Sequence, residues 1–135
     1  MIKLLADVNV EGQVARLALR MQAEPWLEFW NYLDLRCLKF SDVGLQPKDP
    51  DSVVWRRCQE QRLLLLTNNR NDDGPDSLEA TIRTHNTPES LPVFTFGDAD
   101  KISKSQEYAE EVIESLFDQL LRIDALNGTG RLFLP

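Results

Sequence analysis

Residues 63–66 read Leu-Leu-Leu-Leu, and residues 67–75 continue as Thr-Asn-Asn-Arg-Asn-Asp-Asp-Gly-Pro. The four leucines form a short apolar run with no polar residue at alternate positions. Such a run is typical of a strand that is buried on both faces, in the middle of a parallel sheet. The polar residues that follow favour turns, so they predict a loop at the C-terminal end of that strand.

Other short apolar segments recur along the chain and are separated by segments of helical periodicity. The predicted strands are Ile2–Ala6, Leu35–Phe40, Leu63–Leu66 and Pro92–Phe96. The predicted helices cover residues 11–22, 25–33, 50–62, 76–85 and 106–123. Strands that alternate with helices predict an α/β fold, a three-layer sandwich with a mostly parallel four-stranded sheet covered by helices on both faces. The tail Arg131–Leu134 is a short extended segment that could pair with a sheet edge.

Composition narrows the class of protein. The chain has 135 residues, the size of one domain, so residues 1–135 are expected to form a single domain. No apolar run approaches the roughly 20 residues of a membrane span, and the apolar start is shorter than a signal peptide. We therefore expect a cytoplasmic protein with no membrane partner. Cys37 and Cys58 lack the spacing and the histidine neighbours of a zinc site and are expected to be free.

Carboxylate or amide side chains follow three of the four predicted strands. Asp7 directly follows the first strand, Asn69 and Asp72 follow the third, and Asp98 follows the fourth. Asp51 stands at the start of a helix. Ligands of open parallel sheets bind beyond the C-terminal ends of the strands, and oxygen ligands suit Mg²⁺ or Mn²⁺. Asp7 is the strongest candidate, because a carboxylate beside a buried strand is costly unless it is paired or used.

Each of the other acidic positions also has a simpler structural interpretation. Asp49 before Pro50 is a plausible helix cap, and the helix dipole would favour Asp51 in the first turn. Asp72 lies in a stretch that could be an ordinary surface turn, and Asp98 could merely end a strand. Dinucleotide, P-loop, serine-hydrolase and zincin motifs are absent, so no nucleotide cofactor is predicted.

The order of these motifs resembles the short PIN-like proteins, often called PIN-like toxins. The resemblance rests on Leu4–Val10 followed by a helix, on Asp51 with Val54, and on Leu64–Asn71. It covers residues 2–72 well and the remainder only by the order of elements. The resemblance implies a PIN-like fold, an ancestral Mg²⁺- or Mn²⁺-dependent ribonuclease site, and a bacterial toxin–antitoxin or related RNA-processing context.

Carried over residue by residue, the acidic ligands of the PIN-like pattern fall on Asp7, Asp51 and Asn69. The pattern has an aspartate where this chain has Asn69, and another where it has Asn71; its glutamate after the first aspartate falls on Val8. An amide is neutral and binds a divalent cation more weakly than a carboxylate. The metal set implied for this chain is therefore Asp7 and Asp51, with Asp72, Asp73 or Asp98 supplying the missing charge.

Three functional hypotheses follow from the sequence. The first is a metal-dependent ribonuclease of weakened activity, with Asp7, Asp51, Asn69 and Asp72 as the catalytic set and RNA as the partner. The second is an inactive PIN-like module that binds a protein, either an antitoxin-like partner or a second copy, through aromatic residues such as Trp26. The acidic net charge of −7 favours the second, because nucleic-acid binders usually present a basic face. A receiver-like domain is the third, but its site would need an aspartate at the end of the third strand, where Thr67 and Asn68 stand.

Overall fold

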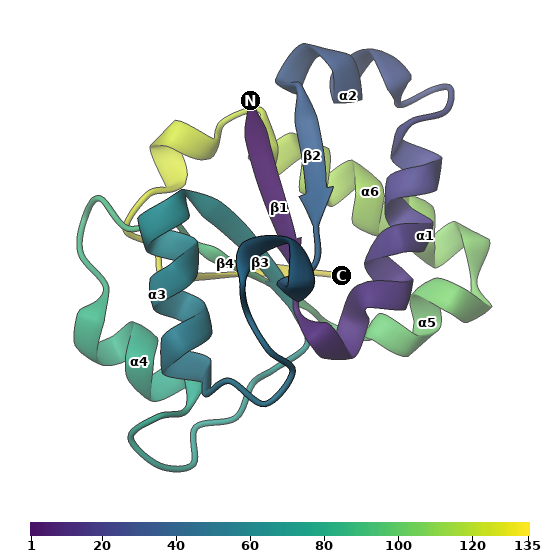
Figure 1. Ribbon diagram of the computed structural model, residues 1–135. Coiled ribbons are helices and arrows are strands. Elements are labelled where there is room, and N and C mark those ends of the chain that lie inside the picture. The colour runs from purple at the N-terminus through teal and green to yellow at the C-terminus, as the bar shows by residue number, and fades with distance from the viewer.

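The computed structural model describes all 135 residues and is built on one parallel sheet (Figure 1). The strands are β1 (Ile2–Ala6), β2 (Leu35–Leu38), β3 (Leu63–Thr67), β4 (Val93–Phe96) and β5 (Arg131–Leu134). They lie in the order β2-β1-β3-β4-β5, and every neighbouring pair is parallel. The α/β class and the covered parallel sheet are confirmed. The predicted number of four strands is wrong, because the tail forms a fifth strand against β4.

The six α-helices are α1 (Glu11–Met21), α2 (Leu27–Leu33), α3 (Asp51–Gln61), α4 (Leu78–His85), α5 (Ala99–Lys104) and α6 (Gln106–Leu120). Three short 3₁₀ helices each lie between a strand and an α-helix: η1 (Val8–Val10), η2 (Phe40–Val43) and η3 (Ile123–Leu126). Hydroxyl caps start two of the helices, because Ser77 accepts from the Ala80 N–H and Ser105 from the Tyr108 N–H. Helix α5 was not predicted from the sequence. None of the helices combines the length and the apolar character that a membrane crossing requires.

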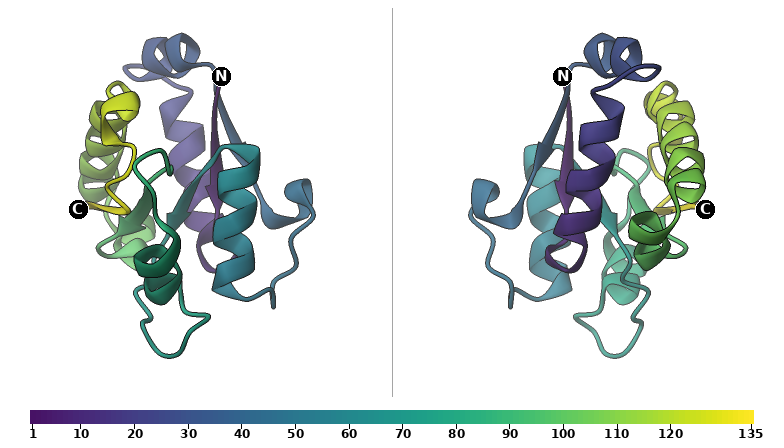
Figure 2. Two further views of the ribbon diagram at one scale, coloured as in Figure 1. Left: turned by 90° about the vertical axis from the view of Figure 1, so that its left-hand side faces the viewer. Right: turned by 90° about the vertical axis from the view of Figure 1, so that its right-hand side faces the viewer.

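Helices cover both faces of the sheet (Figure 2), and the sheet separates two apolar clusters, one on each face. The larger cluster joins alternate residues of β1, β3 and β4, such as Leu4, Leu64 and Phe94, to α1, α5 and α6. The smaller cluster joins the other residues of the same strands, such as Leu5 and Leu65, to α3, α4 and η2. Because neighbouring residues of a strand point to opposite faces, every residue of β3 is buried. This burial explains the run of four leucines.

Strand β5 reaches the sheet through a close backbone contact at Gly128. The Gly128 N–H donates to the Ser90 carbonyl at 2.8 Å, and the Asn86 side chain donates to the Gly128 carbonyl at 2.8 Å. Gly128 has a φ of +86°, and a Cβ atom there would lie 2.9 Å from the Cα of Pro88. The turn therefore requires glycine both for its backbone conformation and for space.

We predict that Gly128→Ala lowers the free energy of unfolding by about 3 kcal/mol. Roughly 1 kcal/mol comes from the left-handed backbone, and the remainder comes from the clash with Pro88. Gly74→Ala is the matched control, because Gly74 has the same φ of +86° with nothing within 4 Å. Urea unfolding of both variants separates the two causes. Equal losses of unfolding free energy in the two variants would show that the contact with Pro88 adds no cost of its own.

Candidate functional site

The site is centred on Asp7, which follows β1 directly. Asp7 is only 9% exposed, and its Oδ2 accepts a hydrogen bond from the Thr67 hydroxyl at 2.6 Å. Thr67 ends β3, the strand beside β1, and is fully buried. The Asp7 N–H also donates to the Leu66 carbonyl, which continues the pairing between the two strands. The predicted position of Asp7 at the C-terminal edge of a buried strand is confirmed.

The environment of Asp7 disfavours its charged form. Burial raises the pKa of the Asp7 carboxyl above its usual range, while the hydrogen bond from Thr67 acts in the opposite direction. The negative charge of Asp51 raises the pKa of Asp7 further. Burial, with a smaller contribution from the Asp7 charge, raises the pKa of the Cys58 thiol on α3 to about 12. Asp7 comes two residues after Leu5, which packs in the cluster with α3, so the alternation along the strand places Asp7 on the α3 side of the sheet.

Asn69 connects the two carboxylates. Its Nδ2 donates to Asp51 Oδ2 at 2.9 Å, and its backbone N–H donates to the Thr67 hydroxyl at 2.9 Å. Its Oδ1 accepts from the Asn71 N–H at 2.8 Å, so both ends of the amide have a defined partner. Asp51 Oδ2 also accepts from the Leu78 N–H at the start of α4. The predicted set of Asp7, Asp51 and Asn69 is thus brought together, and a continuous chain of hydrogen bonds runs through Thr67.

Arg131 supports this loop from β5 and was missed by the sequence analysis. One of its nitrogens, Nη1, donates to the Asn69 carbonyl and to the Thr95 hydroxyl, each at 2.8 Å. The Arg131 side chain is 8% exposed, and its Nη2 lies 3.6 Å from a carboxylate oxygen of Glu79. A single arginine at the start of a short terminal segment carries no sequence signal for such a role. Only the pairing of β5 with β4 places it beneath the loop.

The structure does not bring Asp72 or Asp98 into this hydrogen-bond network, whereas Asp73 and Asp49 line a polar pocket together with Asp51. Asp72 is exposed and makes no hydrogen bond through its side chain, and Asp98 caps α5 by accepting from the Lys101 N–H at 3.2 Å. Asp49 accepts from the Gln46 N–H at 2.7 Å, while the residue that precedes α3 as its cap is Pro50. The prediction of Asp49 as a helix cap is therefore wrong, because its side chain closes the preceding turn instead.

The donor set suits a cation held by few protein ligands. No group of three or more acidic, histidine or cysteine side chains gathers as a metal site, so the predicted four-carboxylate set is not assembled. Asp7 and Asp51 provide two carboxylates, and Asp51 Oδ1 makes no hydrogen bond within the protein. Mg²⁺ is commonly bound through one or two carboxylates, with water and substrate phosphate completing the shell. Asp7 and Asp51 therefore fit Mg²⁺ or Mn²⁺ by the chemistry of their donors.

The aromatic residues considered for partner binding are used mainly within the fold. Trp55 is 5% exposed, and Trp26 stacks on Phe117 at 5.5 Å while its indole N–H donates to Glu110 at 2.7 Å. Phe29 remains 38% exposed, beside Trp26. Trp26 and Trp55 are therefore used within the fold, whereas Phe29 and, in the same helix, Tyr32 remain exposed.

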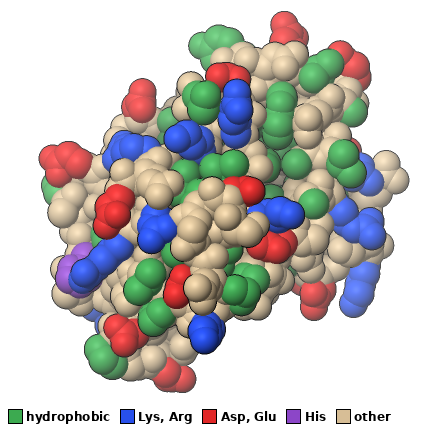
Figure 3. Space-filling model, in the orientation of Figure 1, with side chains coloured by type: hydrophobic (Ala, Val, Ile, Leu, Met, Phe, Trp, Pro, Cys, Tyr) green, Lys and Arg blue, Asp and Glu red, His purple; other side chains and the backbone are tan.

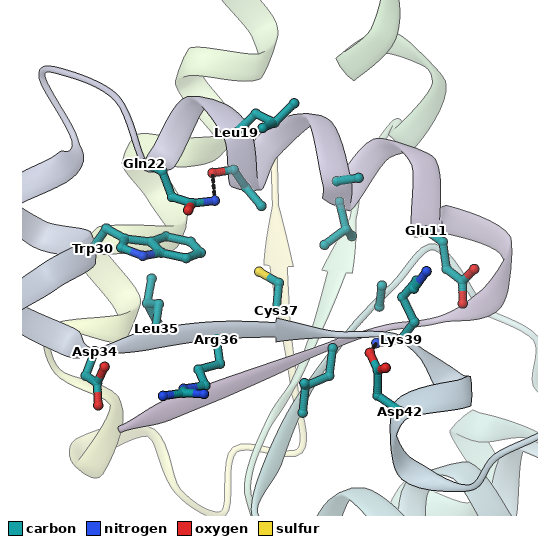
Figure 4. A pocket seen from close by; sticks show the side chains of 15 residues that line it. Glu11, Leu19, Gln22, Trp30, Asp34, Leu35, Arg36, Cys37, Lys39 and Asp42 are labelled. Carbon is teal, nitrogen blue, oxygen red and sulfur yellow. Dashed lines mark hydrogen bonds between the residues drawn. The ribbon is translucent and has the colours of Figure 1, made fainter.

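A groove of about 810 Å³ lies apart from the carboxylates, between α1 and the edge strand β2 (Figure 4). Cys37 of β2 and Trp30 of α2 line it, and so does Gln22, the residue that follows α1, whose side chain donates to the Ala18 carbonyl. Neither Asp7 nor Asp51 lines the groove. Its position on the α1 face of the sheet separates it from the network on the α3 face.

Comparison with protein-family models, with curated proteins and with solved structures finds no match for this chain. The PIN-like resemblance therefore rests on the sequence motifs described above.

We predict that Asp7→Asn raises the melting temperature by a few degrees at pH 8 in buffer that contains EDTA. The folded protein raises the pKa of Asp7, so ionisation of this carboxyl opposes folding as the pH rises through the folded pKa. An asparagine carries no such charge and can still accept from Thr67. The difference between variant and wild type should therefore shrink as the pH falls toward about 3.

Calorimetric melting from pH 3 to pH 8 tests this prediction. Asp72→Asn is the control, because Asp72 is exposed and makes no side-chain hydrogen bond, so its replacement should leave the melting temperature unchanged. A lower melting temperature for Asp7→Asn at every pH would show that the Asp7 charge stabilises the fold.

Proposed function

We propose that the protein is a PIN-like, divalent-metal-dependent ribonuclease-type domain of weak activity. The observation that carries this proposal is the hydrogen-bonded series Asp7–Thr67–Asn69–Asp51 at the C-terminal edge of the sheet. A buried carboxylate with a raised pKa, beside a second carboxylate, is a costly arrangement that clusters at functional sites. The sequence resemblance names the same positions and suggests a bacterial toxin–antitoxin or RNA-processing setting.

Asp7 and Asp51 would hold the cation in this proposal. When bound, Mg²⁺ or Mn²⁺ would orient a water molecule and stabilise the charge that develops on a phosphate group. Thr67 fixes the orientation of the Asp7 carboxylate, because its hydroxyl donates to Oδ2. Asn69 fixes Asp51 in the same way, and Arg131 fixes the backbone of Asn69. The fold thus prepares the two carboxylates before any ligand arrives.

Asn69 also explains why the proposed activity is weak. An amide contributes no negative charge, and its N–H occupies one of the two oxygens of Asp51. A neighbouring unit charge is worth about 4 kcal/mol at a separation of roughly 4 Å and an effective dielectric near 20, before desolvation is subtracted. A site without the third carboxylate therefore holds its cation loosely.

The same contact favours a second candidate function, that of an inactive binding module. In this alternative, the Asn69 side chain takes the place of a cation by donating to Asp51. The carboxylates would then serve the stability and shape of the loop, and the domain would act through a macromolecular partner. Metal binding separates the two candidates.

We predict one or two Mn²⁺ ions per chain in a calorimetric titration of the purified protein. Asp7→Asn should abolish this binding, whereas Asp72→Asn should leave it unchanged, because Asp72 lies outside the network. Cleavage of labelled single-stranded RNA by the wild-type protein in Mn²⁺, and no cleavage by Asp7→Asn, would then establish the activity. No heat of binding at millimolar Mn²⁺ would sink the nuclease proposal and support the binding module.

We predict that Asn69→Asp tightens Mn²⁺ binding at least about tenfold, because it adds a charge beside Asp51. Without metal the same variant should melt at a lower temperature, since like charges then face each other unscreened. Asn68→Asp is the matched control: it makes the same charge change in an exposed neighbour that contacts neither carboxylate. Equal gains in affinity for both variants would show a general effect of loop charge and would argue against a ligand position at Asn69.

A further inference from the structure

An arginine and a phenylalanine stack on each other beside the loop that carries Asn69. The guanidinium carbon of Arg70 lies over the Phe133 ring, 5.6 Å from the ring centroid. Arg70 Nη2 donates to the Phe96 carbonyl at 3.2 Å and to the Gly97 carbonyl at 3.3 Å. Two backbone carbonyls at the end of β4 thus hold the guanidinium over the ring. We call this pair the Arg70–Phe133 stack.

Phe133 is an exposed aromatic residue on an edge strand. It lies on β5, and 60% of its surface is accessible, whereas Phe94 and Phe96 on β4 are buried. Its neighbour Leu134 packs in the larger cluster with α6, so Phe133 faces the other side of the sheet, as Arg131 does. An exposed apolar side chain on an unpaired edge strand favours aggregation. The exposure is therefore a cost to the fold, and a ligand that covers the ring would remove it.

The stack and the candidate carboxylates lie at the same edge of the sheet and are joined by one loop. Arg70 directly follows Asn69, whose side chain donates to Asp51 at 2.9 Å. The residues on both sides of Asn69 are exposed, so the way from the stack to the carboxylates runs over the surface and not through the core. Asp7 and Phe133 stand three strand spacings apart, which is about 14 Å at roughly 4.8 Å per spacing.

We infer that the Arg70–Phe133 stack binds a base of single-stranded RNA and leads the strand toward Asp7 and Asp51. The inference rests on the proposed function, because it assigns a substrate-binding position to that site. The flat shape of the stack carries the choice of ligand, since unpaired RNA bases stack on aromatic rings and on guanidinium planes. About four nucleotides, at the 3.4 Å rise of a stacked strand, would cover the distance to Asp7.

The charge of the chain favours stacking over attraction for phosphate groups. The net charge is −7, and the face seen in Figure 3 carries Lys and Arg side chains interspersed with Asp and Glu side chains. Attraction to a phosphate backbone needs a basic surface, and a mixed surface provides little of it. A base that stacks on an aromatic side chain adds affinity whatever its sequence. An acidic domain therefore has more to gain from one stacked base than from scattered cations.

The test measures the anisotropy of fluorescein-labelled oligoadenylate in EDTA, with an abasic oligonucleotide of the same length as a second probe. Phe133→Leu removes the ring but keeps an apolar side chain. It should bind oligoadenylate at least about fivefold more weakly than wild type, with an unchanged dependence on salt, because stacking involves no counterions. Its weak binding of the abasic probe should equal that of wild type.

Two further variants separate shape from charge. Arg70→Lys keeps the charge but loses the planar group, so it should also weaken the binding of oligoadenylate. Phe133→Trp keeps a flat ring and should bind at least as tightly as wild type. Tyr32→Leu is the matched control, because Tyr32 is 78% exposed on α2, at the opposite end of the sheet, and its loss should change nothing. Melting temperatures confirm that the variants fold.

Three outcomes would overturn the inference. The first is equal binding of oligoadenylate and the abasic probe by wild type, because no base would then be recognised. The second is an equal loss of affinity in Phe133→Leu and Tyr32→Leu, because any exposed aromatic residue would then serve. The third is an absence of oligoadenylate binding by wild type.

Failure of the stack is distinguishable from failure of the proposed function. Base-dependent binding that Phe133→Leu weakens, in a protein that neither binds Mn²⁺ nor cleaves RNA, would keep the stack and refute the nuclease. Cleavage in Mn²⁺ that is lost in Asp7→Asn but equally fast in wild type and Phe133→Leu, with equal RNA affinity, would keep the nuclease and refute the stack.

Discussion

The hydrogen bond from the Thr67 hydroxyl to the Asp7 carboxylate is the contact on which the rest of the site depends. A carboxylate buried at the end of a strand must be hydrogen-bonded. Without a partner it would cost a large part of the small free energy of unfolding of a single domain. Strands β1 and β3 are parallel neighbours in which Ala6 pairs with Leu66, so the next residues along each strand meet side by side. The order of the strands therefore decides which side chain can satisfy Asp7, and it selects Thr67.

The loop after β3 extends this contact outward by short hydrogen bonds. Thr67 accepts from the Asn69 backbone while it donates to Asp7, so one hydroxyl links the strand end to the loop. Asn69 then reaches Asp51 at the start of α3, and Arg131 from β5 binds the carbonyl of Asn69 from below. Strands β1, β3 and β5 and helix α3 thus all converge on a few residues of one loop. These hydrogen bonds give the side chains of the loop defined partners without a bound ligand.

Two kinds of feature could be predicted from the sequence: elements that a local apolar pattern identifies, and polar residues whose burial would cost free energy. The run of leucines at residues 63–66 identifies a strand covered on both faces, and Asp7 is conspicuous because it follows an apolar strand. Arg131 could not be found in this way, because its role arises from a strand pairing that brings it to residue 69. Nor could the sequence distinguish an aspartate that caps α5, as Asp98 does, from one that joins the site. Both kinds of aspartate follow a strand, and only the direction of the side chain separates them.

Asn69 marks a compromise between stability and cation binding. A carboxylate at this position would stand beside Asp51 and within reach of Asp7, so the folded protein would need a cation to offset the repulsion. The amide removes that need, because it donates to Asp51 and completes the chain of hydrogen bonds to Thr67 with no ligand present. The same hydrogen bond would weaken the binding of a cation, because it occupies one carboxylate oxygen of Asp51. The hydrogen bond from Asn69 to Asp51 is therefore the contact that separates the two proposed functions, because a cation at Asp51 would have to share or displace it.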